Sequence, residues 1–186
     1  MATLKLQLRD AYLAGFLYGD GTCYRSKNGA YSVWVDQTSK REELLKSEVI
    51  PRLRREGFKI YVYQYKDRRH GTKKTRVLVY SKKLFEDFRK IRAKPTEYLE
   101  TLDRKDVKLF IAGLFDAEGT ITDRIVIYNS NLKLLRKISE YLINLGIESK
   151  IYKFGSVYGL QIHKKRSMDA FFKEIPSRRL MAHPPG

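Results

Sequence analysis

Two acidic residues occupy the same position in a short segment that occurs twice in the chain. Residues 13–21 read LAGFLYGDG and residues 111–119 read IAGLFDAEG, so Asp20 and Glu118 each precede a glycine. Each segment has helical apolar spacing, which places its acid at the helix C-terminus, where the negative end of the helix dipole disfavours a carboxylate. If the two helices pair, the carboxylates also repel each other. A divalent cation would offset both costs, and Mg²⁺ held there could activate water for phosphodiester hydrolysis.

The same two segments carry small residues four positions apart, Gly15 with Gly19 and Gly113 with Ala117. Residues four apart lie on one helix face, and a face without large side chains lets two backbones approach closely. We therefore expect the helices to pack on each other through a shared set of small residues: Ala14, Gly15, Gly19, Ala112, Gly113 and Ala117. The alternative is two unrelated buried helices that tolerate glycine, with each acid a solvated loop residue. That alternative explains one acid more easily than two at equivalent positions.

The repeat continues beyond these helices. Val35-Asp36-Gln37 matches Ile127-Tyr128-Asn129, and each triplet is followed by an apolar helical run that ends at a glycine, Gly57 or Gly146. Each unit is predicted to form a helix, a β-hairpin, a helix, a second hairpin and a closing helix. Periodicity places the first helix of each unit at 9–20 and 104–118, with strands at 30–36, 59–65, 75–80, 124–128, 149–154 and 157–163. We therefore expect an α+β fold with an N-terminal half at 1–94, a linker at 95–103 and a C-terminal half at 104–186.

The net charge favours a polyanionic partner. The chain has 38 Lys and Arg against 21 Asp and Glu, a formal charge of +17, and both halves are basic. A field of this strength attracts nucleic acid at long range. An anionic membrane surface is the competing interpretation, but no stretch approaches the ~20 apolar residues of a membrane span and no basic amphipathic helix dominates. The lone Cys23 cannot form an internal disulfide and no signal peptide precedes the first helix, which predicts a reducing intracellular compartment.

The two repeated segments resemble the LAGLIDADG motif, and their spacing resembles that of single-chain homing endonucleases with two motifs. The resemblance implies two pseudo-symmetric αββαββα halves, with the paired motif helices at the centre and two antiparallel sheets that form a saddle in the DNA major groove. It also implies an intron-encoded monomer that makes a metal-dependent double-strand break in a long, partly palindromic DNA site and leaves 3′ overhangs. Mg²⁺ is the expected cofactor, although Mn²⁺ or Ca²⁺ could occupy the same sites.

The same resemblance assigns roles to individual residues. The eighth motif position supplies the catalytic carboxylates, here Asp20 and Glu118, and the metal site is expected to include the preceding residues Gly19 and Ala117. An active-site amide follows the second strand, and a basic residue follows the helix after the fourth strand; these are Gln37 and Asn129, and Lys94 and Arg178. Arg178 departs from the pattern if lysine is required, and all four could be ordinary surface residues. Asp116, at the sixth position where the first motif has Tyr18, is interpreted as structural.

Strand alternation divides each expected sheet into a helix-facing side and an outward side. The expected helix-facing residues are Val33, Val35, Ile60, Val62, Val77 and Val79. The outward residues and nearby loops mix basic and aromatic side chains, which can read base edges and hold phosphates. These predicted DNA contacts are Arg25, Lys27, Ser32, Trp34, Asp36, Lys59, Tyr61, Tyr63, Lys74, Arg76, Arg124, Tyr128, Lys150, Tyr152, Gln161 and His163, and Leu78 shares their face. The aromatic residues could instead be core or hairpin-stabilising pairs.

Two other functions fit parts of the sequence. A protein on the same scaffold could bind nucleic acid without cutting it, as a regulator or as an intron RNA splicing cofactor; intact acids in both motifs argue against lost catalysis but do not exclude a dual role. A basic ribosome-associated protein would explain the charge, but it would leave the repeated acids without a purpose.

Overall fold

The repeat in the sequence is also a repeat of structure in the computed structural model, which describes residues 6–68 and 70–182. The N-terminal half consists of α1 (Ala11–Asp20), β1 (Gly21–Arg25), β2 (Tyr31–Thr38), a 3₁₀ turn (Ser39–Arg41), α2 (Glu42–Leu44), a π-helical turn (Leu45–Val49), α3 (Ile50–Arg55), β3 (Ile60–Lys66), β4 (Lys73–Tyr80), α4 (Lys82–Ala93) and α5 (Pro95–Thr101). The C-terminal half consists of α6 (Arg104–Glu118), β5 (Gly119–Ile121), β6 (Ile125–Asn129), α7 (Leu132–Ile143), β7 (Lys150–Phe154), β8 (Val157–Ile162), α8 (Lys165–Glu174) and α9 (Arg178–Met181).

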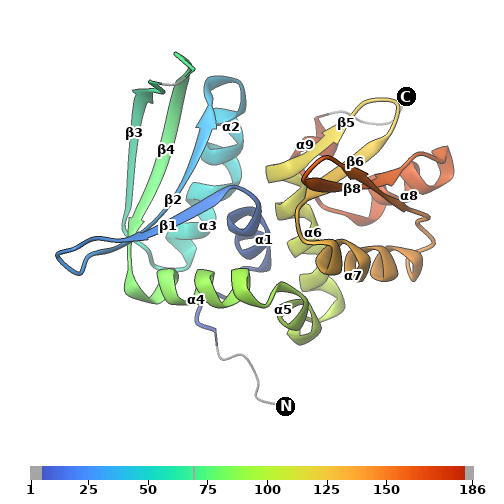
Figure 1. Ribbon diagram of the computed structural model, residues 1–186, viewed down its shortest axis with the longest axis horizontal. Helices are drawn as coiled ribbons and strands as arrows, with labels where there is room; N and C mark the ends of the chain where they lie inside the picture. Colours follow the sequence, from blue (N-terminus) through green and yellow to red (C-terminus); the bar gives the residue numbers. More distant parts are fainter. Residues whose placement is uncertain (1–5, 69, 183–186) are drawn as a thin grey trace.

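The two halves carry antiparallel sheets of identical strand order. The sheet of the N-terminal half runs β1-β2-β4-β3 and that of the C-terminal half runs β5-β6-β8-β7. The registers also correspond, because Gly21 pairs with Val35 in one sheet and Gly119 pairs with Ile127 in the other. Figure 1 shows the two sheets on opposite sides of the molecule with α1 and α6 between them. The expected α+β fold of two pseudo-symmetric halves is confirmed.

The two motif helices touch backbone to backbone. A methyl group added at Gly15 would lie 2.0 Å from the carbonyl oxygen of Phe110, and one added at Gly113 would lie 2.0 Å from the carbonyl oxygen of Tyr12. One added at Gly19 would lie 2.6 Å from the Cβ atom of Ala117. No side chain larger than hydrogen fits at the two crossing points, so glycine there sets the distance between α1 and α6. Of the other small residues assigned to this interface, Ala14 and Ala112 are fully buried.

Both motif helices begin at an aspartate. The side chain of Asp10 accepts a hydrogen bond from the Leu13 amide at 3.0 Å, and that of Asp103 accepts one from the Asp106 amide at 2.8 Å. A carboxylate at this position satisfies a free amide of the first turn and complements the positive end of the helix dipole. Asp103, and not Asp106, is therefore the cap of α6.

Several local expectations need correction. The segment 95–103, expected as a linker, contains the helix α5. Strands β1 and β5, which begin directly after the motif acids, were expected as first strands of hairpins, but no residue range was predicted for either. Val62 is half exposed because β3 is the edge strand of its sheet. Leu78 is nearly buried on the outward face, where Trp34 and Tyr61 are its register partners. Within residues 6–68 and 70–182, no helix combines the length and apolar content required to cross a membrane.

The backbone contact predicts a large cost for a single methyl group. Gly113→Ala should lower the free energy of unfolding by about 3 kcal/mol, because the methyl group meets a carbonyl that belongs to a rigid helix. Gly159→Ala is the control, since its methyl group would meet the ring edge of Phe154, a side chain that can move. Urea unfolding of both variants measures the difference. Equal stabilities would contradict a close contact between α1 and α6.

Candidate active site at the ends of the motif helices

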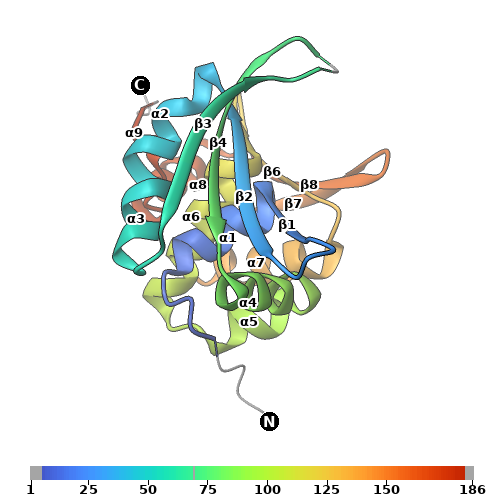
Figure 2. The same ribbon diagram turned by 90° about the vertical axis from the view of Figure 1, so that its left-hand side faces the viewer.

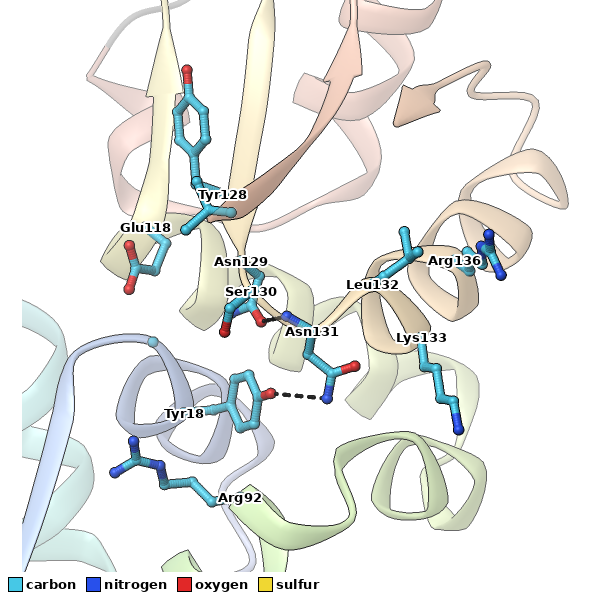
Figure 3. Close-up of a pocket in the computed structure, with 12 residues that line it drawn as sticks. Tyr18, Arg92, Glu118, Tyr128, Asn129, Ser130, Asn131, Leu132, Lys133 and Arg136 are labelled. Atoms are coloured by element: carbon cyan, nitrogen blue, oxygen red, sulfur yellow. Dashed lines mark hydrogen bonds between the residues drawn. The ribbon is translucent and has the colours of Figure 1, made fainter. Parts of the chain in front are cut away.

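The close helix contact brings the two motif acids together. Asp20 is the last residue of α1 and Glu118 is the last residue of α6. A methyl group added at Gly19 would lie 3.0 Å from the Cγ atom of Glu118, so the two helix ends share one site. Both acids are partly buried, and Figure 3 shows Glu118 pointing into the pocket between the halves.

Burial disfavours the charged forms of both acids, and repulsion by Asp20 adds to this effect at Glu118. Burial raises the pKa of Asp20 to about 6, although a hydrogen bond from Gln37 and the positive charges of Arg41 and Arg179 lower it. Burial also raises the pKa of Glu118, and the negative charge of Asp20 raises it further, while Arg41 lowers it. The pair therefore has more negative charge than its surroundings stabilise, a condition that a bound cation would relieve.

The two predicted amides have different partners. Gln37 is buried at the end of β2, and its Nε2 donates a hydrogen bond to the Oδ2 atom of Asp20. Asn129 lies in the pocket that contains Glu118, but its Oδ1 accepts from the amide of Asn131 at 2.9 Å (Figure 3). Gln37 thus contacts its acid directly, whereas Asn129 stabilises the turn that leads into α7.

The predicted basic residues are not the ones that act on the acids. The Nζ of Lys94 pairs with Glu97 at 2.9 Å on the surface. Arg178 lines another pocket, together with Lys40, Arg41 and Arg179. The charges that lower the pKa of Asp20 belong to Arg41 and Arg179.

Three arginines missed from the sequence therefore belong to the site. Arg41 donates from Nη1 to the Ala117 carbonyl at 3.4 Å. Arg179 donates to the carbonyl oxygens of Phe115 and Gly119, and Arg92 lines the Glu118 pocket (Figure 3). These arginines could have been found from their closeness in sequence to the predicted residues. Arg41 lies four residues after Gln37, and Arg92 and Arg179 lie within two residues of Lys94 and Arg178. The side-chain directions that separate these neighbours are set by the fold.

Asp116 is structural, as interpreted from the sequence. It is fully buried and accepts from the Tyr12 hydroxyl at 2.7 Å and the Ser177 hydroxyl at 2.5 Å. It also accepts from the backbone amides of Arg178 and Arg179 at 3.0 and 3.1 Å, at the N-terminus of α9. These bonds join α1, α6 and α9 and hold Arg179 beside the acids.

The pseudo-symmetric counterpart of the Tyr12–Asp116 contact has a different chemistry. There the rings of Tyr18 and Phe110 lie 6.3 Å apart, centroid to centroid, at a tilted angle. The Tyr18 hydroxyl accepts a 3.4 Å contact from the side-chain amide of Asn131 (Figure 3). One end of the helix pair is therefore joined by a charged hydrogen bond and the other by an aromatic contact.

The outward sheet faces hold most of the predicted DNA contacts in accessible positions. Exposed or partly exposed are Arg25, Lys27, Trp34, Asp36, Lys59, Tyr61, Tyr63, Lys74, Arg76, Arg124, Tyr128, Lys150, Tyr152 and His163. Ser32 and Gln161 need correction, because both lie in the expected register yet are nearly buried. Ser32 donates to the carbonyl of Tyr24 in the neighbouring strand at 3.1 Å. Phe154, which was not predicted, is exposed and contacts Tyr128 edge to face at 5.8 Å.

The sheets project to one side of the molecule. In Figure 2 the β3–β4 and β7–β8 hairpins both extend to the right, away from α3 and α9.

The similarity of this chain to known proteins agrees with the two-halved geometry. Residues 7–91 and 105–176 match the model of the LAGLIDADG-like domain, one match in each half. The chain belongs to this family. The homing endonuclease I-DmoI of Desulfurococcus mucosus is 31% identical over 160 residues, which cover 82% of this chain and 78% of that protein.

Solved structures lead to the same family. The crystal structure of I-DmoI in complex with DNA and Mn has a TM-score of 0.71 at 29% identity, covering 92% of this chain and 97% of that chain. Full-length DUF199/WhiA from Thermatoga maritima has a TM-score of 0.65 at 13% identity, covering 98% of this chain and 60% of that chain. The similarity to DUF199/WhiA is one of fold alone.

The raised pKa of Asp20 predicts that stability depends on pH with a definite sign. The folded chain binds this proton more tightly than the unfolded chain, whose pKa is near 3.8, so stability should rise as the pH falls from about 6 toward 4. The gain should be about 1 to 3 kcal/mol relative to Asp20→Asn, which lacks the titrating group. Denaturant unfolding with chelator present measures it. A difference that stays constant across this range would contradict the burial of a charged Asp20.

Proposed function

We propose that this chain is a site-specific DNA endonuclease that makes a double-strand break with the help of divalent cations. The main support is the pairing of Asp20 and Glu118, two carboxylates held together at helix ends where neither is well stabilised. The similarity to I-DmoI points the same way, because structures of that protein hold its DNA with Mn, with Ca and in the presence of Mg.

The donor set suits Mg²⁺. Among the described residues no group of three or more His, Cys, Asp or Glu side chains is placed to hold a metal ion, so the two motif carboxylates are the available acidic ligands. Mg²⁺ is commonly held by one or two carboxylates, retains several waters and takes further oxygens from substrate phosphates. We assign the ligands to Asp20 and Glu118, with backbone oxygens of Gly19 and Ala117 nearby; Mn²⁺ and Ca²⁺ accept the same oxygen donors.

The chain's own residues prepare this site. A metal bound there would lower the pKa of a water molecule and stabilise the leaving oxygen of the phosphodiester. Gln37 fixes the orientation of the Asp20 carboxylate by donating to one of its oxygens. Arg41 and Arg179 favour the ionised form of Asp20, the form that binds cations. Arg92, in the Glu118 pocket, is placed to attract a DNA phosphate.

The remaining features of the proposal concern the DNA. The charge of +17 supplies sequence-independent attraction to phosphates. Two sheets with different outward side chains in one monomer fit a long, partly palindromic site, on the order of two helical turns if each half covers one. Acids paired at the minor groove would cut the strands with a stagger that leaves 3′ overhangs, and the lone Cys23 fits a reducing intracellular compartment.

One assay tests the cutting activity. Duplex DNA recovered by binding selection from a randomised library is incubated with the protein and Mg²⁺ or chelator. Double-strand cutting should require the metal, and Asp20→Asn or Glu118→Gln should reduce its rate by about a hundredfold or more with binding retained. Asp123→Asn, which removes an exposed carboxylate from the β5–β6 turn, is the control.

The outcomes separate the candidate functions. Tight, selective binding without cutting under Mg²⁺ or Mn²⁺ would favour a non-cleaving nucleic-acid-binding protein or an RNA splicing cofactor. Cutting that survives both motif substitutions would place the reaction elsewhere.

The corrected basic residues give a further prediction. Arg41 lowers the pKa of both acids, so Arg41→Ala should move the acidic limb of the pH–rate profile of cutting to higher pH and reduce the rate near neutral pH about tenfold. Lys94→Ala removes an equal charge from a surface ion pair and should leave profile and rate unchanged. A shift caused by Lys94→Ala instead would restore the role first assigned to it.

A further inference from the structure

One arginine on the outward face of the N-terminal sheet is held on a single edge of its guanidinium group. Arg76 in β4 and Asp36 in β2 are register partners. The Nε and Nη2 atoms of Arg76 donate to the Oδ1 and Oδ2 atoms of Asp36, each at 2.7 Å. This two-point contact fixes the plane of the guanidinium as well as its position.

Aromatic rings hold the same group from its faces. The central carbon of the Arg76 guanidinium lies 4.9 Å from the ring centroid of Trp34 and 5.0 Å from that of Tyr65. The ring of Tyr63 is 6.0 Å away. Cation–π attraction and the Asp36 contact together order a side chain that would otherwise lose rotamer freedom on binding DNA.

The opposite edge of the guanidinium makes only long contacts. The Nη1 atom has only a 3.4 Å contact with the Tyr63 hydroxyl, and Nη2 adds a 3.3 Å contact with the Tyr65 hydroxyl to its bond with Asp36. Both distances are at the weak end of the hydrogen-bond range. The Nη1/Nη2 edge therefore still presents two N–H donors side by side, a pair that matches the O6 and N7 acceptors of guanine in the major groove.

We propose that Arg76 reads one guanine in the major groove of the N-terminal half-site and that Asp36 is its positioning residue, not a DNA contact. This inference rests on the proposed function, because it requires the sheet to face DNA. Asp36 has both carboxylate oxygens bonded to Arg76, and a carboxylate pointed at phosphates would be repelled. The pair is close to neutral as a unit, so its effect falls on base preference more than on overall affinity.

The corresponding positions of the C-terminal sheet hold no arginine–aspartate pair. Val35 and Ile127 are equivalent, because they pair with Gly21 and Gly119. The next residues, Asp36 and Tyr128, pair with Arg76 and Gly159, so Tyr128 and Gly159 occupy the positions of Asp36 and Arg76. The ring of Phe154 lies over Gly159, where an added methyl group would be 2.8 Å from its edge. The two half-sites should therefore differ at this base pair, with guanine required only in the N-terminal one.

The chain also offers a matched control. Arg124 makes the same kind of contact with Asp123, its Nε and Nη2 atoms donating to the two carboxylate oxygens. These two residues lie on the β5–β6 turn with side chains 44% and 68% exposed, and no ring packs on the arginine among the aromatic contacts of the described residues. Asp123→Asn removes the same charge as Asp36→Asn without affecting Arg76.

The test is a binding selection with the full chain, a randomised duplex library and chelator to prevent cutting. The unmodified protein should prefer guanine about tenfold at one position of the N-terminal half-site. Arg76→Lys keeps the positive charge but loses the Nη1/Nη2 edge of the guanidinium. It should reduce the guanine preference at this position below about twofold, while the base preferences at the other positions of the site remain. Asp36→Asn should weaken the same preference without lowering affinity for random DNA, and Asp123→Asn should leave it intact.

Replacing that guanine by 7-deazaguanine gives a second measurement, in which the DNA base is altered. The loss of N7 should weaken binding by the unmodified chain several-fold and leave binding by Arg76→Lys unchanged. A selected site with no guanine preference that depends on Arg76, or an Asp36→Asn variant with full preference, would overturn the inference alone. Absence of any sequence selection by the unmodified chain would overturn the proposed function, and the inference with it.

Discussion

The contact between the backbones of α1 and α6 determines the rest of the structure. Gly15 and Gly113 let each helix rest on a carbonyl of the other, and this distance fixes how far apart the ends of both helices lie. The strands that follow begin directly at those ends, so the same contact also sets the separation of the two sheets. A wider helix spacing would move the acids apart and increase the separation of the two sheets.

The close approach of the helix ends leaves the carboxylates of Asp20 and Glu118 poorly stabilised in their charged forms. Burial raises the proton affinity of both acids, and the charge of Asp20 raises that of Glu118 further. Arg41 acts on both acids, whereas Gln37 and Arg179 act only on Asp20. The arrangement is asymmetric even though the scaffold is symmetric. The sheets repeat this pattern: a charged pair ringed by aromatics stands on one, and an aromatic ring over a glycine stands at the corresponding place on the other.

The sequence was sufficient for features that repeat and insufficient for features that depend on neighbours. The motif helices, the paired acids and the succession of helices and hairpins follow from motifs present twice, because chance does not reproduce the same spacing in the same order. The ion pair of Lys94 with Glu97 could not be predicted, because it is a local contact that no repeat encodes. Alternation gave the correct face for Leu78 and Gln161 but not their burial, which comes from the side chains beside them. Arg41 and Arg179 act through side-chain directions that only packing fixes.

The unlike ends of the motif-helix pair determine which half can pair with which. Two N-terminal halves brought together would set Tyr12 against Tyr18, and no carboxylate would receive the Tyr12 hydroxyl. Two C-terminal halves would set the ring of Phe110 against Asp116, which would lose one of its donors inside an apolar contact. Self-association through this surface is therefore penalised in either combination, and the heterotypic match within one chain is the arrangement that pairs the Tyr12 hydroxyl with Asp116.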